Sequence, residues 1–292
     1  MAAAGSQETL GGHEGARAIA ALILANALLA FGPVLVRLSD VGPVASAFWR
    51  MAIAFPILAG AAAWTGRGKP SGFSPALIMI IALSGLLFAA DLASWHLGIV
   101  RTKAANATLF GNSASLLFPI YGFVVARSWP TRRQGLALLV AALGAAVLMG
   151  RSAELSPEHV AGDLLSLVAG VFYAFYFIAI ARARATMTPL PLLAASTLAS
   201  GVPLLLLALA LGETIMPHNW WPLLALSFCS QIAGQGLMTR ALGRTSPLII
   251  GLALLMQPVV AAISGYAMFG ETLGALDLLG AVLIAVALVL VR

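Results

Sequence analysis

The chain has 292 residues, of which 61% are hydrophobic and only 9% are charged. Soluble domains carry about 25% charged residues, so a chain with this composition has too few charges to cover the surface of a water-soluble protein of its size. The net charge of +6 does not indicate nucleic acid binding, because the basic residues lie in short loops between apolar runs, where bilayer proteins carry them. The single cysteine, Cys229, excludes an intrachain disulfide and a cysteine zinc cluster.

Apolar runs of about 18 or more residues recur along the chain, and each is long enough to cross the hydrocarbon of a bilayer. The sequence therefore predicts an all-α membrane protein with ten transmembrane helices. The small, polar residues 1–16 predict a disordered N-terminal tail, and the first apolar run is too long for the core of a signal peptide. The predicted spans are 18–37, 44–64, 75–98, 105–126, 133–150, 161–181, 190–211, 219–239, 247–268 and 273–291.

Ten spans place both termini on the same side of the membrane. If that side is the cytoplasm, most of the 16 lysines and arginines lie inside, and Arg50 lies within the second span, near its outer end. The positive-inside rule therefore predicts an inner-membrane protein with cytoplasmic termini. The six tryptophans fall near predicted span ends, as expected of interfacial anchors. The basic residues left outside are Arg37, Arg101, Lys103 and Arg151.

A weak internal repeat divides the chain. The stretch GIVRTKAANATLFGNSASLLFPIYGF aligns with ALGRTSPLIIGLALLMQPVVAAISGY, which pairs Arg101 with Arg244. The repeat predicts a first five-helix unit over residues 17–151 and a second over residues 152–292. Because five is odd, the second unit enters the membrane in the opposite sense. Such inverted repeats are typical of secondary transporters.

The last two spans carry a resemblance to a known family. The stretch ALGRTSPLIIGLALLMQPVVAAISGYAMFGETLGALDLLGAVLIAVALVLV resembles the C-terminal span pair of EamA-type proteins of the drug/metabolite transporter superfamily, and FWRMAIAFP in the second span also fits. The resemblance covers the whole chain and implies the ten-helix inverted-repeat fold and secondary transport. The first half has no acid in the region equivalent to Glu271, which we therefore interpret as a helix-terminus or loop residue. The matching residues are Thr245-Ser246-Pro247, Pro258, Gly270-Glu271 and Gly280.

The third span contains an aspartate and a histidine in the stretch FAADLASWH. An ionisable side chain at the membrane centre costs about 2.5–3.5 kcal/mol and usually faces the bundle interior or a wet cavity. Asp91 shares a helix face with Trp95, whereas His96 is rotated by about 140° from Asp91. All three are candidate cavity residues, and Asp91 or His96 could carry the proton of a proton-coupled antiporter. The alternative is hydrogen bonding between helices, which we prefer for His96.

Other polar and aromatic side chains within the spans are also candidates for the substrate cavity. Tyr173 and Tyr176 would form an aromatic wall, for which core packing is the alternative. The amides and hydroxyls have interhelical hydrogen bonding as their alternative, worth about 0.6 kcal/mol each. Prolines remove a helix hydrogen bond, so we expect kinks at Pro33, Pro119 and Pro258 that free carbonyls beside the cavity. The remaining candidates are Asn112, Ser113, Gln231, Gln235 and Gln257.

The fifth and tenth spans present small residues at helical spacing, which permit close helix approach. We assign these spans to a scaffold or to self-association, without a role in the pathway. The residues are Ala137, Ala141, Ala145, Gly274, Ala281 and Ala285.

The leading functional hypothesis is a secondary carrier, without a cofactor, that exports amino acids or related small metabolites by alternating access. The family resemblance suggests this class of solute. Carriers of sugar phosphates or nucleotide sugars belong to the same superfamily, but they would need lysine or arginine inside the cavity. The predicted interior offers Asp91, amides and aromatics, and so favours a zwitterionic, neutral or cationic solute.

An intramembrane enzyme and a channel are the competing hypotheses. The four histidines lie far apart in the sequence, and HExxH, GxSxG and P-loop motifs are absent. We therefore predict no catalytic residue and no metal site. A channel would carry a repeated filter motif or a ring of charges, and the sequence shows neither.

Overall fold

The computed structural model of the chain describes residues 12–65, 74–102, 104–150, 157–242, 244–257, 259–260, 263 and 274–290. All regular secondary structure within these residues is helical. The described part contains five helical segments that are long and apolar enough to cross a membrane, which agrees with the predicted class of protein. These segments are Arg17–Leu38, Pro43–Thr65, Pro75–Ile99, Val160–Ala183 and Pro189–Ala210.

The first predicted span is two helices, separated by a break at Ala30 and Phe31. Pro33 lies in the first turn of the second helix, and a proline ring clashes with the carbonyl four residues earlier, so the preceding helix ends there. The helix thus breaks just before Pro33, one of the three prolines at which a kink was predicted. The two helices are α1 (Gly12–Leu29) and α2 (Gly32–Leu38), so that α1 begins within the predicted tail and residues 1–11 lie outside the described residues.

The fourth span is also broken, but not at its proline. The break lies at Asn112 and Ser113, while Pro119 remains inside the following helix. Two hydrogen bonds to the carbonyl three residues earlier, from Ser113 N to Phe110 O and from Ser115 N to Asn112 O, tighten the backbone at the break. The helices up to residue 150 are α3 (Pro43–Thr65), α4 (Pro75–Ile99), α5 (Ala104–Gly111), α6 (Ala114–Ala126) and α7 (Arg132–Gly150).

The eighth span contains a feature that the sequence did not predict. Residues Ser227–Gly234 form a π-helix, η1, between two α-helical segments. Pro258 and Glu271 lie outside the described residues, although α12 ends four residues before Pro258. The remaining helices are α8 (Val160–Ala183), α9 (Pro189–Ala210), α10 (Trp221–Leu226), α11 (Gln235–Ala241), α12 (Pro247–Leu254) and α14 (Ala275–Leu290).

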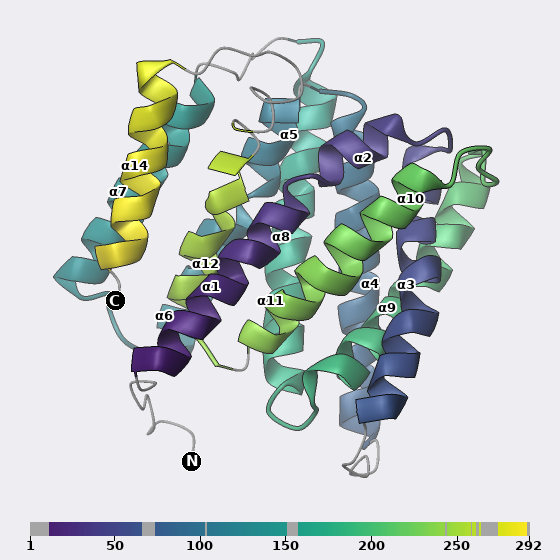
Figure 1. The fold of residues 1–292 in the computed structure, drawn as a ribbon, viewed down its shortest axis with the longest axis horizontal. Helices are drawn as coiled ribbons and strands as arrows, with labels where there is room; N and C mark the ends of the chain where they lie inside the picture. Colours follow the sequence, from purple (N-terminus) through teal and green to yellow (C-terminus); the bar gives the residue numbers. More distant parts are fainter. Residues whose placement is uncertain are drawn as a thin grey trace.

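Helices from before residue 150 pack mainly on helices from after residue 157 (Figure 1). The main pairs are α4 with α8, α3 with α9, α7 with α14, α6 with α12, and α1 with α11 and η1. At one end of the bundle, Arg37 Nη2 donates to the carbonyls of Ile99 and Thr102, both at 2.9 Å. Thr102 Oγ1 in turn donates to Asp163 Oδ1 at 2.6 Å. The ends of α2 and α4 therefore meet the start of α8, which runs in the opposite direction to both.

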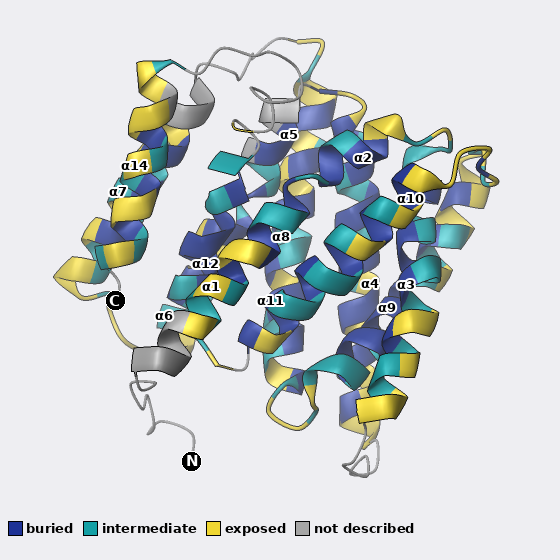
Figure 2. Ribbon diagram, viewed as in Figure 1, coloured by how far each residue is buried: buried dark blue, intermediate teal, exposed yellow. Residues whose placement is uncertain are grey.

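The largest cluster of buried side chains draws on α1, α3, α4, α6, α8, α9, α11 and α12, whereas the outer helix faces are exposed (Figure 2). A separate cluster joins α7 to α14. On α7 the predicted small residues Ala137, Ala141 and Ala145 are all buried. On α14 the prediction is partly wrong, because Ala285 is exposed and Ile284 and Ala287 are buried instead. The two backbones are close at Gly144, where an added Cβ would lie 2.9 Å from the carbonyl oxygen of Gly280.

Candidate functional site

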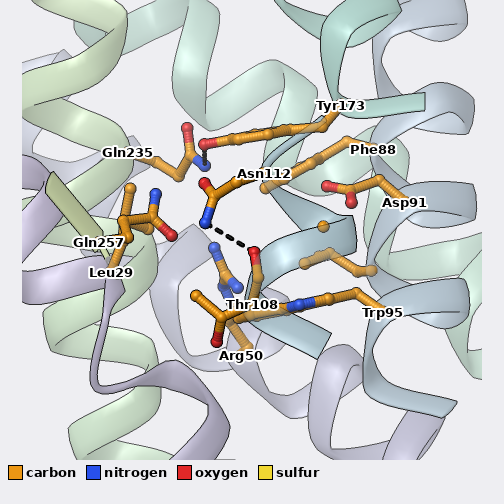
Figure 3. A pocket seen from close by; sticks show the side chains of 12 residues that line it. Leu29, Arg50, Phe88, Asp91, Trp95, Thr108, Asn112, Tyr173, Gln235 and Gln257 are labelled. Carbon is orange, nitrogen blue, oxygen red and sulfur yellow. Dashed lines mark hydrogen bonds between the residues drawn. The ribbon is translucent and has the colours of Figure 1, made fainter. Parts of the chain in front are cut away.

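A compact cavity of about 50 Å³ lies where the two parts of the chain meet. Helices α1, α3, α4 and α5 contribute its walls from the first part, and α8, α11 and the segment after α12 from the second. In Figure 3, Asp91 and Trp95 lie on one side, Gln235 and Gln257 lie on the other, and Arg50 and Asn112 lie between them. The lining residues are Leu29, Arg50, Phe88, Asp91, Leu92, Trp95, Thr108, Gly111, Asn112, Tyr173, Gln235 and Gln257.

The structure brings together most of the predicted cavity residues, but not all. His96, Tyr176 and Gln231 are buried beside the cavity without lining it. Ser113 lines a second, mostly apolar hollow of about 270 Å³ between α5, α6, α7 and α8, which shares Asn112 with the cavity. The predicted residues that line the cavity are Asp91, Trp95, Asn112, Tyr173, Gln235 and Gln257.

Arg50 is the lining residue that most changes the view obtained from the sequence. It lies in α3 rather than in a loop, and only 2% of its surface is exposed. Its Nε donates to Gln231 Oε1 at 3.2 Å, and its guanidinium carbon lies 5.6 Å from the centre of the Phe88 ring. The sequence interpretation placed Arg50 near the outer end of its span and assigned no cation to the interior. A charge within a long apolar run was the same signal that identified Asp91.

Asp91 is 7% exposed and lines the same cavity from α4. In the described part of the chain, its carboxylate has no hydrogen bond and no basic group within ion-pair distance, Arg50 included. An unpaired charge in an apolar interior is costly, and intramembrane charges are therefore usually paired or functional. One acidic and one basic side chain thus share one small cavity without direct contact.

His96 serves the structure at one end of α3. Its Nδ1 lies 2.9 Å from Ser46 Oγ and 3.0 Å from the carbonyl oxygen of Pro43. Both partners belong to the first turn of α3, so the ring fixes the start of that helix against α4. This agrees with the hydrogen-bonding alternative for His96.

Aromatic rings close one side of the cavity. The rings of Phe88 and Tyr176 stack at 4.3 Å with an angle of 12° between their planes. Tyr173 lies parallel to Tyr176 at 6.0 Å, and contacts Phe177 at 4.2 Å. Of these four rings, Phe88 and Tyr173 line the cavity, and Tyr176 belongs to the packed layer behind them. Core packing therefore describes Tyr176, whereas Tyr173 lies where a cavity residue was predicted.

Three buried glutamines are fixed by hydrogen bonds in or beside the cavity. Gln231 accepts from Arg50 and donates through Nε2 to Thr197 Oγ1 at 2.9 Å. Gln235 Nε2 donates to the Tyr173 hydroxyl at 2.7 Å, and its Oε1 is buried without a partner within the described residues. Gln257 Nε2 donates to Asn26 Oδ1 at 3.0 Å. Gln235 and Gln257 thus line the cavity in fixed orientations. Gln231 does not line it, but its hydrogen bond orients the Arg50 guanidinium.

The loop that follows α9 is hydrogen-bonded to the first turns of α3, and we call this set of contacts the clasp. Glu213 accepts hydrogen bonds from the first amides of α3, at 2.7 Å from Ala45 N and 3.3 Å from Val44 N. The Trp49 indole donates to the carbonyl of Ile215 at 2.6 Å. These contacts tie α3 to the loop that follows α9, and so join the two parts of the chain. Among the described residues, no group of three or more metal-ligating side chains occurs.

The comparisons with known proteins agree with the two-part arrangement. The EamA-like transporter family matches the chain twice, over residues 16–150 and 160–292. An uncharacterized transporter of Archaeoglobus fulgidus is 30% identical over 144 residues, a match that spans 48% of each protein. A solved crystal structure covering 93% of this chain and 97% of its own superposes with a TM-score of 0.74 at 18% identity, which shows a shared fold. The two matches together cover nearly the whole chain, and the protein therefore belongs to the EamA-like transporter family, within the drug/metabolite transporter superfamily.

Proposed function

We propose that this membrane protein is a secondary transporter with ten spans in two inverted five-helix repeats, and that it exports amino acids or related small metabolites by alternating access. The observation that carries the proposal is the central cavity, which takes its walls from both parts of the chain and contains two charged side chains. A binding site between two similar units of opposite orientation can open to one side and then to the other when the units exchange conformations.

The pattern of contacts supports the inverted repeat. If residues 17–151 and 152–292 are related by a twofold axis in the membrane plane, each contact has a symmetry mate. The α4–α8 pair then corresponds to the pair formed by α1 with α11 and η1, and both pairs are present. The pairs α3–α9, α6–α12 and α7–α14 would each lie on the axis, and these are present too.

The size of the cavity supports a change of conformation during transport. About 50 Å³ has room for only a few water molecules on this measure of volume. A metabolite of several heavy atoms requires the helices around the site to separate. The clasp formed by Glu213, Trp49 and their partners joins the two parts at one end, and its opening would widen the cavity on that side.

Reconstitution in liposomes tests the proposal. Purified protein would be assayed for counterflow of labelled amino acids, with a labelled sugar phosphate in parallel and with or without an imposed proton gradient. Saturable amino-acid counterflow supports the proposal, and counterflow of the sugar phosphate alone identifies the other class of solute. Ohmic ion current indicates a channel, and conversion without flux indicates an enzyme.

Asp91→Asn tests whether Asp91 takes part in transport. We expect the variant to fold in normal yield and to lose transport or the dependence of transport on pH, since the amide cannot exchange a proton. Asp163→Asn is the matched control, because Asp163 is similarly buried but lies at the start of α8, away from the cavity lining. Unchanged transport over the whole pH range in Asp91→Asn would assign Asp91 to structure alone.

A further inference from the structure

In the part of the chain that the structure describes, the Arg50 guanidinium forms its hydrogen bond to the protein through Nε alone. Its Nε is occupied by Gln231, which is itself fixed by Thr197. Within the described residues, neither Nη1 nor Nη2 has a hydrogen-bond partner, and Arg50 lines the cavity. The paired terminal nitrogens of arginine match the two oxygens of a carboxylate, which they bind with two parallel hydrogen bonds.

Phe88 lies beside both charged groups. It is one turn before Asp91 on the same face of α4, and its ring lies under the Arg50 guanidinium. The stacked rings of Tyr173 and Tyr176 hold the Phe88 ring in place. The aromatic layer and Gln231 therefore fix Arg50 in a position from which it does not reach Asp91.

Opposite charges attract strongly in a low-dielectric interior, so two flexible groups in one cavity would be expected to form an ion pair. No salt bridge joins Arg50 and Asp91 within the described residues, so every guanidinium nitrogen of Arg50 lies more than 4.0 Å from the carboxylate oxygens of Asp91. A lone anion at Arg50 would face the carboxylate of Asp91, and a lone cation at Asp91 would face the guanidinium of Arg50. A ligand that carries both charges avoids both repulsions.

We propose that the cavity binds the two charged ends of one zwitterionic solute, with Arg50 holding the carboxylate and Asp91 holding the ammonium group. This inference rests on the proposed function and identifies the specificity-determining residues of its site. Gln231 and Thr197 act as positioning residues for Arg50. Gln235 and Gln257 on the opposite wall, and Asn112 between the two sides, contact the rest of the solute.

Binding measurements on the purified full chain test the proposal independently of transport. The probes are the twenty common L-amino acids, each with its carboxamide and its N-acetyl derivative. For the amino acid that binds most tightly, we expect each blocked derivative to bind about 10- to 100-fold more weakly, since each loses a hydrogen-bonded charge. Equal affinity of the wild-type protein for the free and the blocked forms would overturn the proposal.

For each variant we compare the affinity for the free amino acid with the affinity for each blocked derivative. A variant that binds all ligands more weakly leaves these ratios unchanged, so it is not mistaken for one that has lost a charge preference. Arg50→Gln should abolish the preference for the acid over the carboxamide and retain the preference for the free amine. Asp91→Asn should show the reverse pattern. Arg50→Lys should keep part of the acid preference, since the charge remains but the paired nitrogens do not. Preferences that persist unchanged in Arg50→Gln and Asp91→Asn would show that the charges are structural.

Arg37→Gln and Asp163→Asn are the matched controls, because both side chains bond at the end of the bundle and not in the cavity. Both should keep the two preferences. Counterflow measured on the same samples separates the two proposals. If amino acids are transported but the free and blocked forms bind equally well, the zwitterion site is refuted and the transport proposal stands. Charge preferences without flux would confirm the site and refute transport.

Discussion

Asp40 shows how a single exposed residue can hold two loops together. Its Oδ2 accepts hydrogen bonds from the backbone amides of His218 at 2.8 Å and Asn219 at 2.9 Å. Partial desolvation raises the pKa of Asp40, but the hydrogen bonds to its charged form outweigh this and hold the pKa below its usual value. Because Asp40 lies in the loop between α2 and α3 and binds the loop after α9, its contacts lie next to the clasp.

The lowered pKa predicts how the loop contact depends on pH. A carboxyl group whose pKa is lower in the folded state stabilises the fold above its unfolded pKa, and this contribution is lost as the pH falls through the folded pKa. We therefore expect the amides of His218 and Asn219 to be protected from hydrogen exchange at neutral pH. The protection, corrected for intrinsic exchange rates, should fall only below the usual aspartate pKa of about 3.9.

Asp40→Ala should remove this protection at every pH, while the amide of Leu211, which caps α9 by donating to Leu207 O, keeps its own. Protection of His218 and Asn219 that survives in Asp40→Ala would show that another contact holds the loop.

At the level of elements, the breaks in the helices differ in whether the sequence predicts them. The break before Pro33 follows from covalent structure and was predictable. The break at Asn112 and the π-helix Ser227–Gly234 depend on which neighbours satisfy the backbone and on where side chains must reach, so sequence periodicity did not reveal them. The π-helix carries Gln231 toward Arg50, and π segments of this kind occur frequently at functional sites.

The α7–α14 pair allows a test at the scale of one helix interface. A side chain at Gly144 would meet the Gly280 carbonyl and the Leu283 side chain, both at 2.9 Å from an added Cβ, whereas Gly135 on the same helix has no neighbour within 4 Å. We expect Gly144→Leu to lower the free energy of unfolding by about 1–3 kcal/mol, because a packed interface must separate. Gly135→Leu should be near neutral or slightly stabilising.

Thermal unfolding in detergent, with amino-acid binding measured in parallel, checks this prediction. Binding should persist in folded Gly144→Leu, because α7 and α14 contribute no residue to the cavity. Equal stability of the two variants would mean that α14 does not pack on α7 as described. In this structure the buried face of α7 is covered by α14 of the same chain, so self-association through that face would require the pair to separate.

For the whole molecule, the two-part arrangement and the positive-inside rule predict which loops face the cytoplasm. The loop after α6 should be cytoplasmic, and the loop after α9, which contributes to the clasp, should face the other side. In a Cys229→Ser background, Ser128→Cys and Met216→Cys place single cysteines in these two loops. Met216 is 63% exposed and Ser128 is also exposed, so both are accessible to reagents.

A membrane-impermeant thiol reagent applied to intact cells should label Met216→Cys only, and permeabilised cells should allow labelling of both positions. Labelling of Ser128→Cys, but not of Met216→Cys, in intact cells would reverse the proposed orientation. Labelling of both positions in intact cells would refute the predicted number of crossings between them.

The sequence by itself determined that this is an all-helical membrane protein of the EamA-like transporter family, because composition and local motifs are visible without coordinates. It also identified Asp91 and several polar neighbours, since a charge or an amide in an apolar run is visible without coordinates. The tertiary structure decided which of these residues share one cavity. His96 faces the start of α3, Tyr176 packs behind Tyr173, and Arg50 reaches the centre. The physical reason is that helix direction and rotation are set by packing between the two parts, which no local pattern specifies.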